Sequence, residues 1–276
     1  MPDEMWKGLR FRLRIARILT SVTVVLVAVA SAVGLFVSGL YRDNAWVTPQ
    51  NQGTDLVTLA VVVPCLILAM RSAGKGSSRG TIAWFGLLGY VCYIYTGAAF
   101  AYAFNAAFLL YVVLFSLSIA SLVALATRID VVQIQGHFDD RTPVRPVAVF
   151  MALIAFMLCV LWIGQIVPFF INGTVPAGIT QAGAQTSFIY VLDLGVVVPL
   201  ALLGAVLLWL RRPWGVVIAG FVLVKAASMG LALLAMTWFL SRSGQPVDGM
   251  LSIVWLFLAT SAIGMTLWFL RHCHCE

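Results

Sequence analysis

The chain has 276 residues, of which 62% are hydrophobic and only 10% are charged, and its mean hydropathy is +1.02. Soluble domains carry about a quarter charged residues, so this composition excludes an ordinary soluble protein and indicates a membrane protein. The sequence contains no P-loop, HExxH, GxSxG or GxGxxG motif and no soluble segment large enough for an ATPase or kinase. A self-contained primary pump is therefore not expected, and no cofactor is predicted.

Eight apolar runs follow one another along the chain, most of them long enough to cross a bilayer as a helix. The runs cover residues 16–40, 55–70, 81–103, 106–127, 147–170, 188–210, 214–240 and 249–270. A helix satisfies its own backbone hydrogen bonds in lipid, so the predicted fold class is all-α, a polytopic membrane helix bundle. We expect a single transmembrane domain over residues 1–276. The second run is the shortest and contains Pro64, so its ends are the least well defined.

The distribution of Lys and Arg predicts the orientation, because cytoplasmic loops carry the excess of these residues. If the N-terminus lies inside, the outer loops hold only Arg42 and Arg242 of the 17 basic residues, and Lys225 lies within a run. Both termini are therefore predicted to be cytoplasmic. The net charge of +7 is explained by this topology and requires no nucleic-acid partner. Basic inner edges also favour anionic lipid head groups, by about 1 kcal/mol per residue near the surface.

The second and sixth runs share a pattern that predicts a parallel four-plus-four repeat. Each begins with an acid followed by leucine, contains Val-Val-Val-Pro (61–64 and 196–199) and ends in arginine. The repeat halves would be 1–127 and 146–271, joined by a cytoplasmic loop, 128–145. Asp55 would then correspond to Asp193, and Tyr90 to Lys225. The alternative is chance similarity in a valine-rich chain, because the spacing from the acid to the proline differs between the two runs.

Lys225 and Asp193 are the ionisable residues that lie well inside the predicted spans. An ionisable group at membrane depth costs at least a few kcal/mol on insertion scales, so it is read as a functional hypothesis. The helix ends place Asp193 nearer the outer face and Lys225 nearer the midplane, roughly 14 Å lower by rise per residue. This spacing favours separate sites, or a link through water and polar side chains, over a direct ion pair. Lys225 has three interpretations: a proton- or substrate-coupling group, a Schiff-base lysine as in retinal proteins, or a structural lysine.

Other polar residues are expected in the same outer layer as Asp193. Gln165 lies near the end of the fifth run, Tyr102 and Asn105 lie at the turn between the third and fourth runs, and Tyr190 precedes Asp193. Together they predict a polar pocket open to the outer side, which would favour cations or zwitterions. Packing between helices is the competing interpretation. Asp55 joins this set as a binding candidate, or else caps the start of the second helix.

Two cytoplasmic segments contain potential metal ligands, but no metal site is predicted. The tail residues His272, Cys273, His274 and Cys275 are weak candidates for zinc or copper. Alternate residues of an extended chain point to opposite sides, so a flexible tail is the favoured interpretation. The loop 135–141 is mixed in charge and is predicted to be a solvated connector. The aromatic side chains concentrated in the third and fourth runs are interpreted as packing and interfacial anchors, or as the lining of a hydrophobic pocket.

A diffuse set of features runs through most of the chain. It comprises Gly-Thr-Asp-Leu-Val at 53–57, the loop 71–80, Trp84 with the Tyr-rich third run, Asp193, Pro199, the turn 211–215 and Lys225. In these features the chain resembles an uncharacterised family of bacterial multi-pass integral membrane proteins. The resemblance implies a bacterial plasma (inner) membrane and supplies no activity.

The leading functional hypothesis is a small-solute or ion carrier in which Asp193 and Lys225 control charge in a central cavity. The first alternative is a membrane-embedded enzyme acting on a lipid or quinone, with Asp193 and Tyr190 as its only candidate pair. The second is a non-catalytic scaffold or sensor, in which the polar layer is packing. The sequence leaves these three alternatives open.

Overall fold

Eight helices in the computed structural model are long and apolar enough to cross a membrane, as the sequence predicts. The structure describes residues 13–139 and 141–273. The spans are α2 (Arg14–Phe36), α3–η1–α4 (Val47–Ala73), α5 (Ser78–Ala101), α6 (Phe108–Ala126), α8 (Val144–Asn172), α10–η2–α11 (Phe188–Trp209), α12 (Pro213–Arg242) and α13 (Gly249–Arg271). Many large apolar side chains on the outside of the bundle are exposed, among them Leu68, Phe156 and Phe257. This apolar surface is what a multi-pass protein presents to a lipid bilayer.

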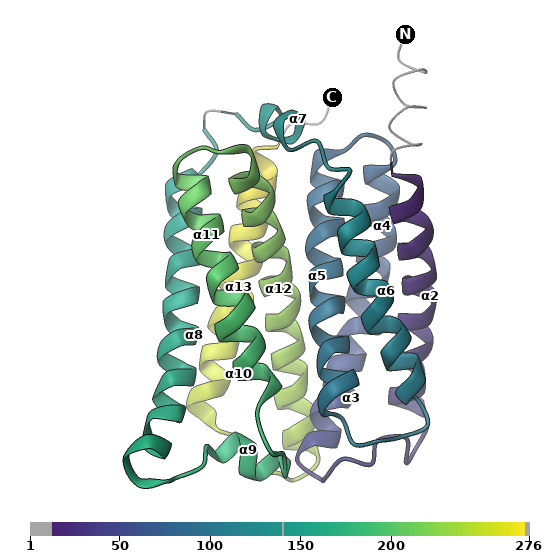
Figure 1. Cartoon of the computed structure of the whole chain (residues 1–276), viewed down its shortest axis with the longest axis vertical. Helices are drawn as coiled ribbons and strands as arrows, with labels where there is room; N and C mark the ends of the chain where they lie inside the picture. The colour runs from purple at the N-terminus through teal and green to yellow at the C-terminus, as the bar shows by residue number, and fades with distance from the viewer. Residues whose placement is uncertain (1–12, 140, 274–276) are drawn as a thin grey trace.

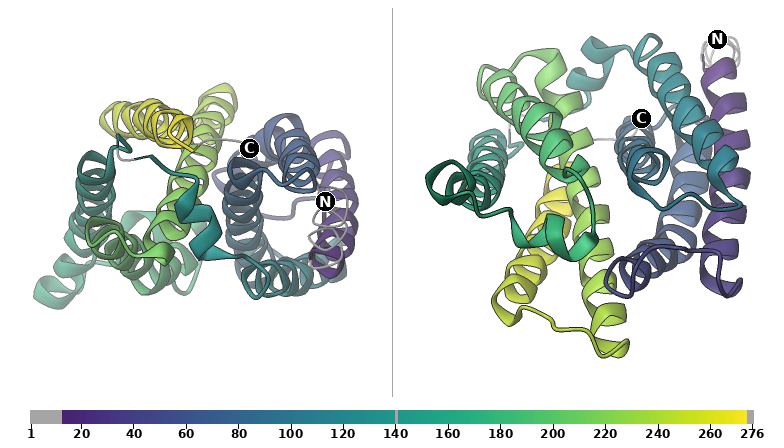
Figure 2. Two further views of the ribbon diagram at one scale, coloured as in Figure 1. Left: turned by 90° about the horizontal axis from the view of Figure 1, so that it is seen from above. Right: turned by 60° about the horizontal axis from the view of Figure 1, so that its bottom comes forward.

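The spans form two groups of four helices, which meet along α5 and α12 (Figure 2). One group contains α2, α3–η1–α4, α5 and α6, and the other contains α8, α10–η2–α11, α12 and α13 (Figure 1). In α5 and α12, 67% of the most apolar 18-residue stretch of the helix is buried inside the protein, whereas the share is 28–39% in the other six spans. Each group also has its own cluster of buried apolar residues. The interface between the halves is therefore formed by α12 with α5 and α3, both of which pack against it.

Two spans contain a π-helix immediately before their proline. The π-helix η1 (Thr58–Val62) lies between α3 (Val47–Val57) and α4 (Val63–Ala73). The π-helix η2 (Asp193–Val197) lies between α10 (Phe188–Leu192) and α11 (Val198–Trp209). Pro64 and Pro199 have no N–H to donate, and a proline ring clashes with the carbonyl of the preceding turn, so a wider turn relieves the clash. The two π-helices begin at Thr58 and Asp193, so a repeat that superposes them would pair Thr58, and not Asp55, with Asp193.

The second span starts earlier than hydropathy predicts. It was expected over 55–70, but the helix begins at Val47 because Asn44 Oδ1 accepts hydrogen bonds from the backbone N–H groups of Trp46 and Val47 at 3.1 and 3.0 Å. The first turns of α3 carry polar residues such as Gln50 and Asn51, so hydropathy alone does not predict that the helix includes them.

One end of the bundle, which we call the basic end, is where α2 begins and α13 ends (top of Figure 1). The short helix α7 (Val131–Gly136) crosses this end and packs against α12, with Ile134 buried. Gln135 and Gly136, the first two residues of the predicted solvated connector 135–141, belong to α7, where Gln135 is half-buried and Gly136 is exposed. At the opposite end, α9 (Ala177–Ala182) lies between α8 and α10.

The described part of the C-terminal tail is docked at the basic end. Cys273 is buried and forms an isolated β-bridge with Phe138, and its carbonyl accepts a hydrogen bond from Arg79 Nε at 2.5 Å. His272 Nδ1 lies 2.9 Å from the Trp268 carbonyl oxygen. The expectation of a flexible tail is thus wrong as far as Cys273, whereas His274 and Cys275 lie outside the described residues.

Candidate functional site

Asp193 is buried at the start of η2, and both of its carboxylate oxygens accept hydrogen bonds. The hydroxyl of Tyr93, on α5, donates to Oδ1 at 2.9 Å. The indole Nε1 of Trp162, on α8, donates to Oδ2 at 2.8 Å. Hydrogen bonds inside a protein are electrostatically stronger than in water, because the local dielectric is low. The carboxylate is therefore held by side chains from both halves of the bundle.

Lys225 lies on α12 beside the same tyrosine. Its side chain is buried, and its Nζ lies 3.9 Å from the centroid of the Tyr93 ring. An ammonium over an aromatic face is attracted by the ring quadrupole, and the attraction increases when the pair is desolvated. Tyr93 thus contacts the ammonium with its ring and the carboxylate with its hydroxyl. The helix ends expected from the sequence favour separate sites, or a link through water and polar side chains, over a direct ion pair, and Tyr93 is a polar side chain that contacts both residues. We call Asp193, Tyr93, Trp162 and Lys225 the Asp–Tyr–Lys group.

A second pair of side chains lies next to this group. Tyr190 OH donates to Gln165 Oε1 at 2.8 Å, and the Tyr190 ring lies 4.9 Å from the Trp162 ring. Trp162 and Gln165 are one turn apart on α8, so they share a face of that helix. The hydroxyl of Tyr190 is therefore directed to Gln165, whereas the carboxylate of Asp193 is bonded to Tyr93 and Trp162.

A different network surrounds Asp55 in the first half of the chain. Asp55 is buried within α3, nearer the start than the end of the second span, and its Oδ2 accepts a hydrogen bond from Tyr41 OH. The capping interpretation is wrong, because α3 begins at Val47 and Asp55 is within it. The Tyr41 ring packs at 5.8 Å against Tyr102, which packs at 5.8 Å against Tyr111. Burial, and then the charge of Asp55, raise the pKa of Tyr41 far above its ordinary value, so this phenol stays neutral and keeps its proton for Asp55.

Asn105 and Asp43 organise the turns at the opposite end of the first half. Asn105 Oδ1 accepts from the backbone N–H of Ala107 at 2.9 Å just before α6. Asp43 Oδ1 accepts from the backbone N–H of Ala103 at 2.9 Å, which ties the loop after α2 to the turn after α5. Both residues satisfy backbone donors, so the geometry gives them a structural role at this end of the bundle.

The half-buried Asp43 should make stability depend on pH. Burial raises its pKa above the ordinary value of 3.8, although the bond from Ala103 opposes the shift. The folded state then binds more protons than the unfolded state, so stability is greatest below the ordinary pKa and falls as pH rises through the folded pKa. We expect Asp43→Asn to flatten this part of a melting-temperature profile in detergent. Asp248→Asn, at the exposed N-cap of α13, is the control. If the melting-temperature profile of Asp43→Asn were the same as that of the wild type, Asp43 would not be the source of the pH dependence.

The seven candidate binding residues are distributed over two networks. Asp193, Lys225, Gln165 and Tyr190 lie around η2 and α8, whereas Asp55, Tyr102 and Asn105 lie in the first half. The sequence reasoning did not assign Tyr93, Trp162 and Tyr41 to a site. Trp162 could have been suggested by its position one turn before Gln165, but no local pattern distinguishes Tyr93 from the other tyrosines of α5.

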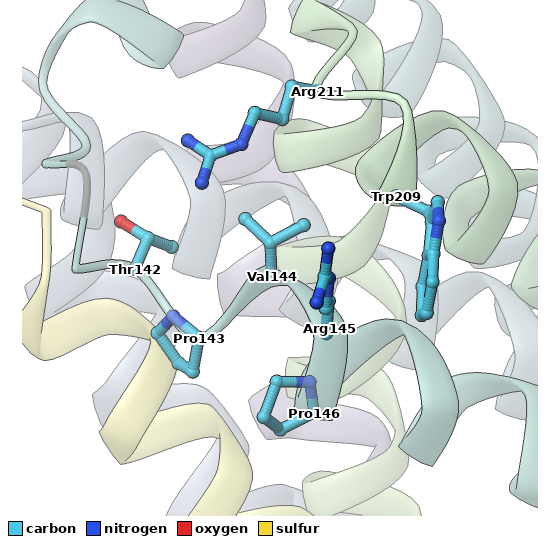
Figure 3. Close-up of a pocket in the computed structure, with 7 residues that line it drawn as sticks. All are labelled: Thr142, Pro143, Val144, Arg145, Pro146, Trp209 and Arg211. Atoms are coloured by element: carbon cyan, nitrogen blue, oxygen red, sulfur yellow. The ribbon is translucent and has the colours of Figure 1, made fainter.

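Two cavities open at the basic end of the bundle. One, of about 340 Å³, lies at the start of α8 beside the α11–α12 turn and is lined by Thr142, Pro143, Val144, Arg145, Pro146, Trp209 and Arg211. Figure 3 shows the Arg145 guanidinium beside the Trp209 ring, and the distance from its carbon to the ring centroid is 5.7 Å. The other, of about 380 Å³, is lined by Arg17, Arg71, Gly74 and Lys75.

Among residues 13–139 and 141–273, no three His, Cys, Asp or Glu side chains come together in a way that could hold a metal ion. Comparison with protein-family models, with curated proteins and with solved structures finds no match for this chain.

Proposed function

We propose that this protein is a membrane carrier for a small solute or ion, and that the Asp–Tyr–Lys group is its charge-bearing site. One observation carries the proposal: a buried carboxylate and a buried lysine share a single tyrosine at the interface of the two halves. Ionisable residues at membrane depth face the protein interior, pair with one another and mark solute or proton pathways. Burying such a pair is costly, so its presence calls for a role beyond packing.

The chemistry of the group favours a cation or a zwitterion as the solute. A cationic group can take the place of a donor at Asp193, and an anionic group can approach Lys225. Both changes exchange one hydrogen-bonded or ionic contact for another, so the solute enters without leaving a charge unpaired. Tyr190 and Gln165 are the adjacent polar side chains that could contact the uncharged part of such a solute.

We also propose that the two halves are a repeat, which would fit a carrier architecture. Thr58 Oγ1 lies 3.0 Å from Tyr90 OH, and the same number of residues separates Thr58 from Tyr90 as separates Asp193 from Lys225. A Cβ added at Gly86 would meet Val224, and one added at Gly89 would meet Phe221. In the repeat alignment Gly86 corresponds to Phe221 and Gly89 to Val224, so these contacts are reciprocal, as expected about a two-fold axis. Parallel repeats of this kind form several transporter folds, with the site at the repeat interface.

We further propose that the carrier lies in a bacterial plasma membrane with its basic end in the cytoplasm. The excess of Lys and Arg at that end supports this orientation.

The experiment that tests the proposal is labelling of a single cysteine at position 225. The five native cysteines are replaced, Lys225→Cys is introduced, and liposomes are treated with a membrane-impermeant thiol reagent from each side. A carrier predicts labelling from at least one side, at a rate that changes with a pH gradient. Tyr93→Cys serves as a second probe of the same site if Lys225→Cys does not fold.

Leu223→Cys is the matched control, because Leu223 lies on the same helix and is fully buried in the apolar core. Labelling at 225 and 93 that is as slow as at 223, in folded protein, would contradict a solvated pathway. A non-catalytic scaffold is the second candidate, and one observation favours it: both oxygens of Asp193 already have donors from this chain. The scaffold predicts the slow labelling.

A further inference from the structure

The cavity of about 380 Å³ at the basic end is unusual in its charge. Three of its four lining residues are cationic: Arg17 from α2, Arg71 from the last turn of α4, and Lys75 from the turn that follows. No carboxylate is among these lining residues. Three cations around one space repel one another unless an anion is shared between them.

The helices position these side chains. Arg71 lies in the last turn of α4 and Lys75 in the turn that follows, and both line the cavity. The guanidinium of Arg17 lies against Gly74, where an added Cβ would be 3.2 Å from both the guanidinium carbon and Nη1. A larger residue at 74 would displace this group, so the glycine allows Arg17 to approach the end of α4.

The chemistry of the cavity matches a phosphate group. A guanidinium presents a planar set of N–H donors that fits phosphate oxygens in a bidentate manner, and lysine adds a point charge. The cavity lies at the ends of two spans, which is the depth at which the head groups of phospholipids lie.

We propose that Arg17, Arg71 and Lys75 form a binding site for a phosphate group, carried by an anionic phospholipid or by a soluble phosphate compound. The site is distinct from the Asp–Tyr–Lys group and does not depend on the carrier proposal. The cavity in the other half is lined by two arginines, Arg145 and Arg211, beside prolines and Trp209, and Arg145 faces the indole ring. We assign phosphate to the first half, because three of the four residues that line its cavity are cationic.

The test is lipid binding to the purified full-length protein, measured by native mass spectrometry in mixed micelles with phosphatidylglycerol or phosphatidylcholine. The triple variant Arg17→Gln/Arg71→Gln/Lys75→Gln is compared with Arg128→Gln/Arg212→Gln/Arg271→Gln, which removes the same charge from exposed residues at the same end. We expect the cavity variant to bind phosphatidylglycerol on the order of tenfold or more weakly, since it loses the charge-assisted contacts that two guanidinium groups and one ammonium group make with the phosphate. The control variant should bind as the wild type does.

Equal binding of the two lipids by the wild type, or equal losses in the two triple variants, would overturn the proposal, because no specific recognition of phosphate at this cavity would remain. Inorganic phosphate is then added as a competitor. Displacement of the lipid would identify the phosphate group itself as the recognised element, and a soluble phosphate compound as a possible source. Retention of the lipid, with the cavity variant still impaired, would identify a membrane phospholipid as the source. Size-exclusion profiles and helical circular dichroism establish that both variants are folded.

Discussion

Replacing Asp193 with leucine is expected to destabilise the protein by about 3–5 kcal/mol, because removing one partner leaves a buried charge uncompensated. Lys225 would lose its nearby anion, and the donors of Tyr93 and Trp162 would lose their acceptor. Each buried donor without a partner adds about 1–3 kcal/mol to the cost. Unfolding in a graded mixture of detergent and denaturant, followed by helical circular dichroism, measures the effect.

A double-mutant cycle separates the interaction with Lys225 from the loss of hydrogen bonds. Lys225→Met removes the ammonium while keeping much of the side-chain volume, and the double variant Asp193→Leu/Lys225→Met removes both charges. We expect the double variant to be more stable than the sum of the single effects predicts, with a coupling of roughly 1–3 kcal/mol. Strict additivity would show that Asp193 and Lys225 do not interact through Tyr93.

Gly53→Ala is expected to have the second large effect, because α3 and α12 approach closely at this position. A Cβ at residue 53 would lie 2.5 Å from the backbone nitrogen of Met236 and 2.6 Å from the backbone carbon of Ala235. Backbone in a transmembrane helix moves only if the helix itself shifts, so the methyl group should separate α3 from α12. Overpacking of this kind costs about 1–3 kcal/mol. The same unfolding assay measures the loss.

Gly264→Ala is the matched control for this change. Gly264 lies within α13, and a Cβ there would meet nothing within 4 Å. Alanine has a higher helix propensity than glycine, by about 1 kcal/mol, so the control should be neutral or stabilising. If the two alanine variants had equal stability, α3 and α12 would not be in close contact at Gly53.

The candidate site could be predicted only in part from the sequence. Asp193 and Lys225 stand out because charged residues are rare inside apolar runs, whatever the tertiary fold. Tyr93 does not stand out, because it is one of several tyrosines on α5, and only the packing of α5 against α12 and η2 places it beside both Lys225 and Asp193. Asp55 and Asp193 look alike in the sequence, yet different aromatic residues donate to them in different halves of the bundle.

The sequence by itself determined the class of protein, the number of spans and most of their ends. These depend on the transfer of apolar segments into lipid and on backbone hydrogen bonds within each helix, and both are local properties. The tertiary structure decided the rest: the grouping of the spans around α5 and α12, the docking of α7 and Cys273, and the partners of each buried polar residue. These features arise from contacts between residues far apart in the chain, and hydropathy contains no information about which apolar faces meet.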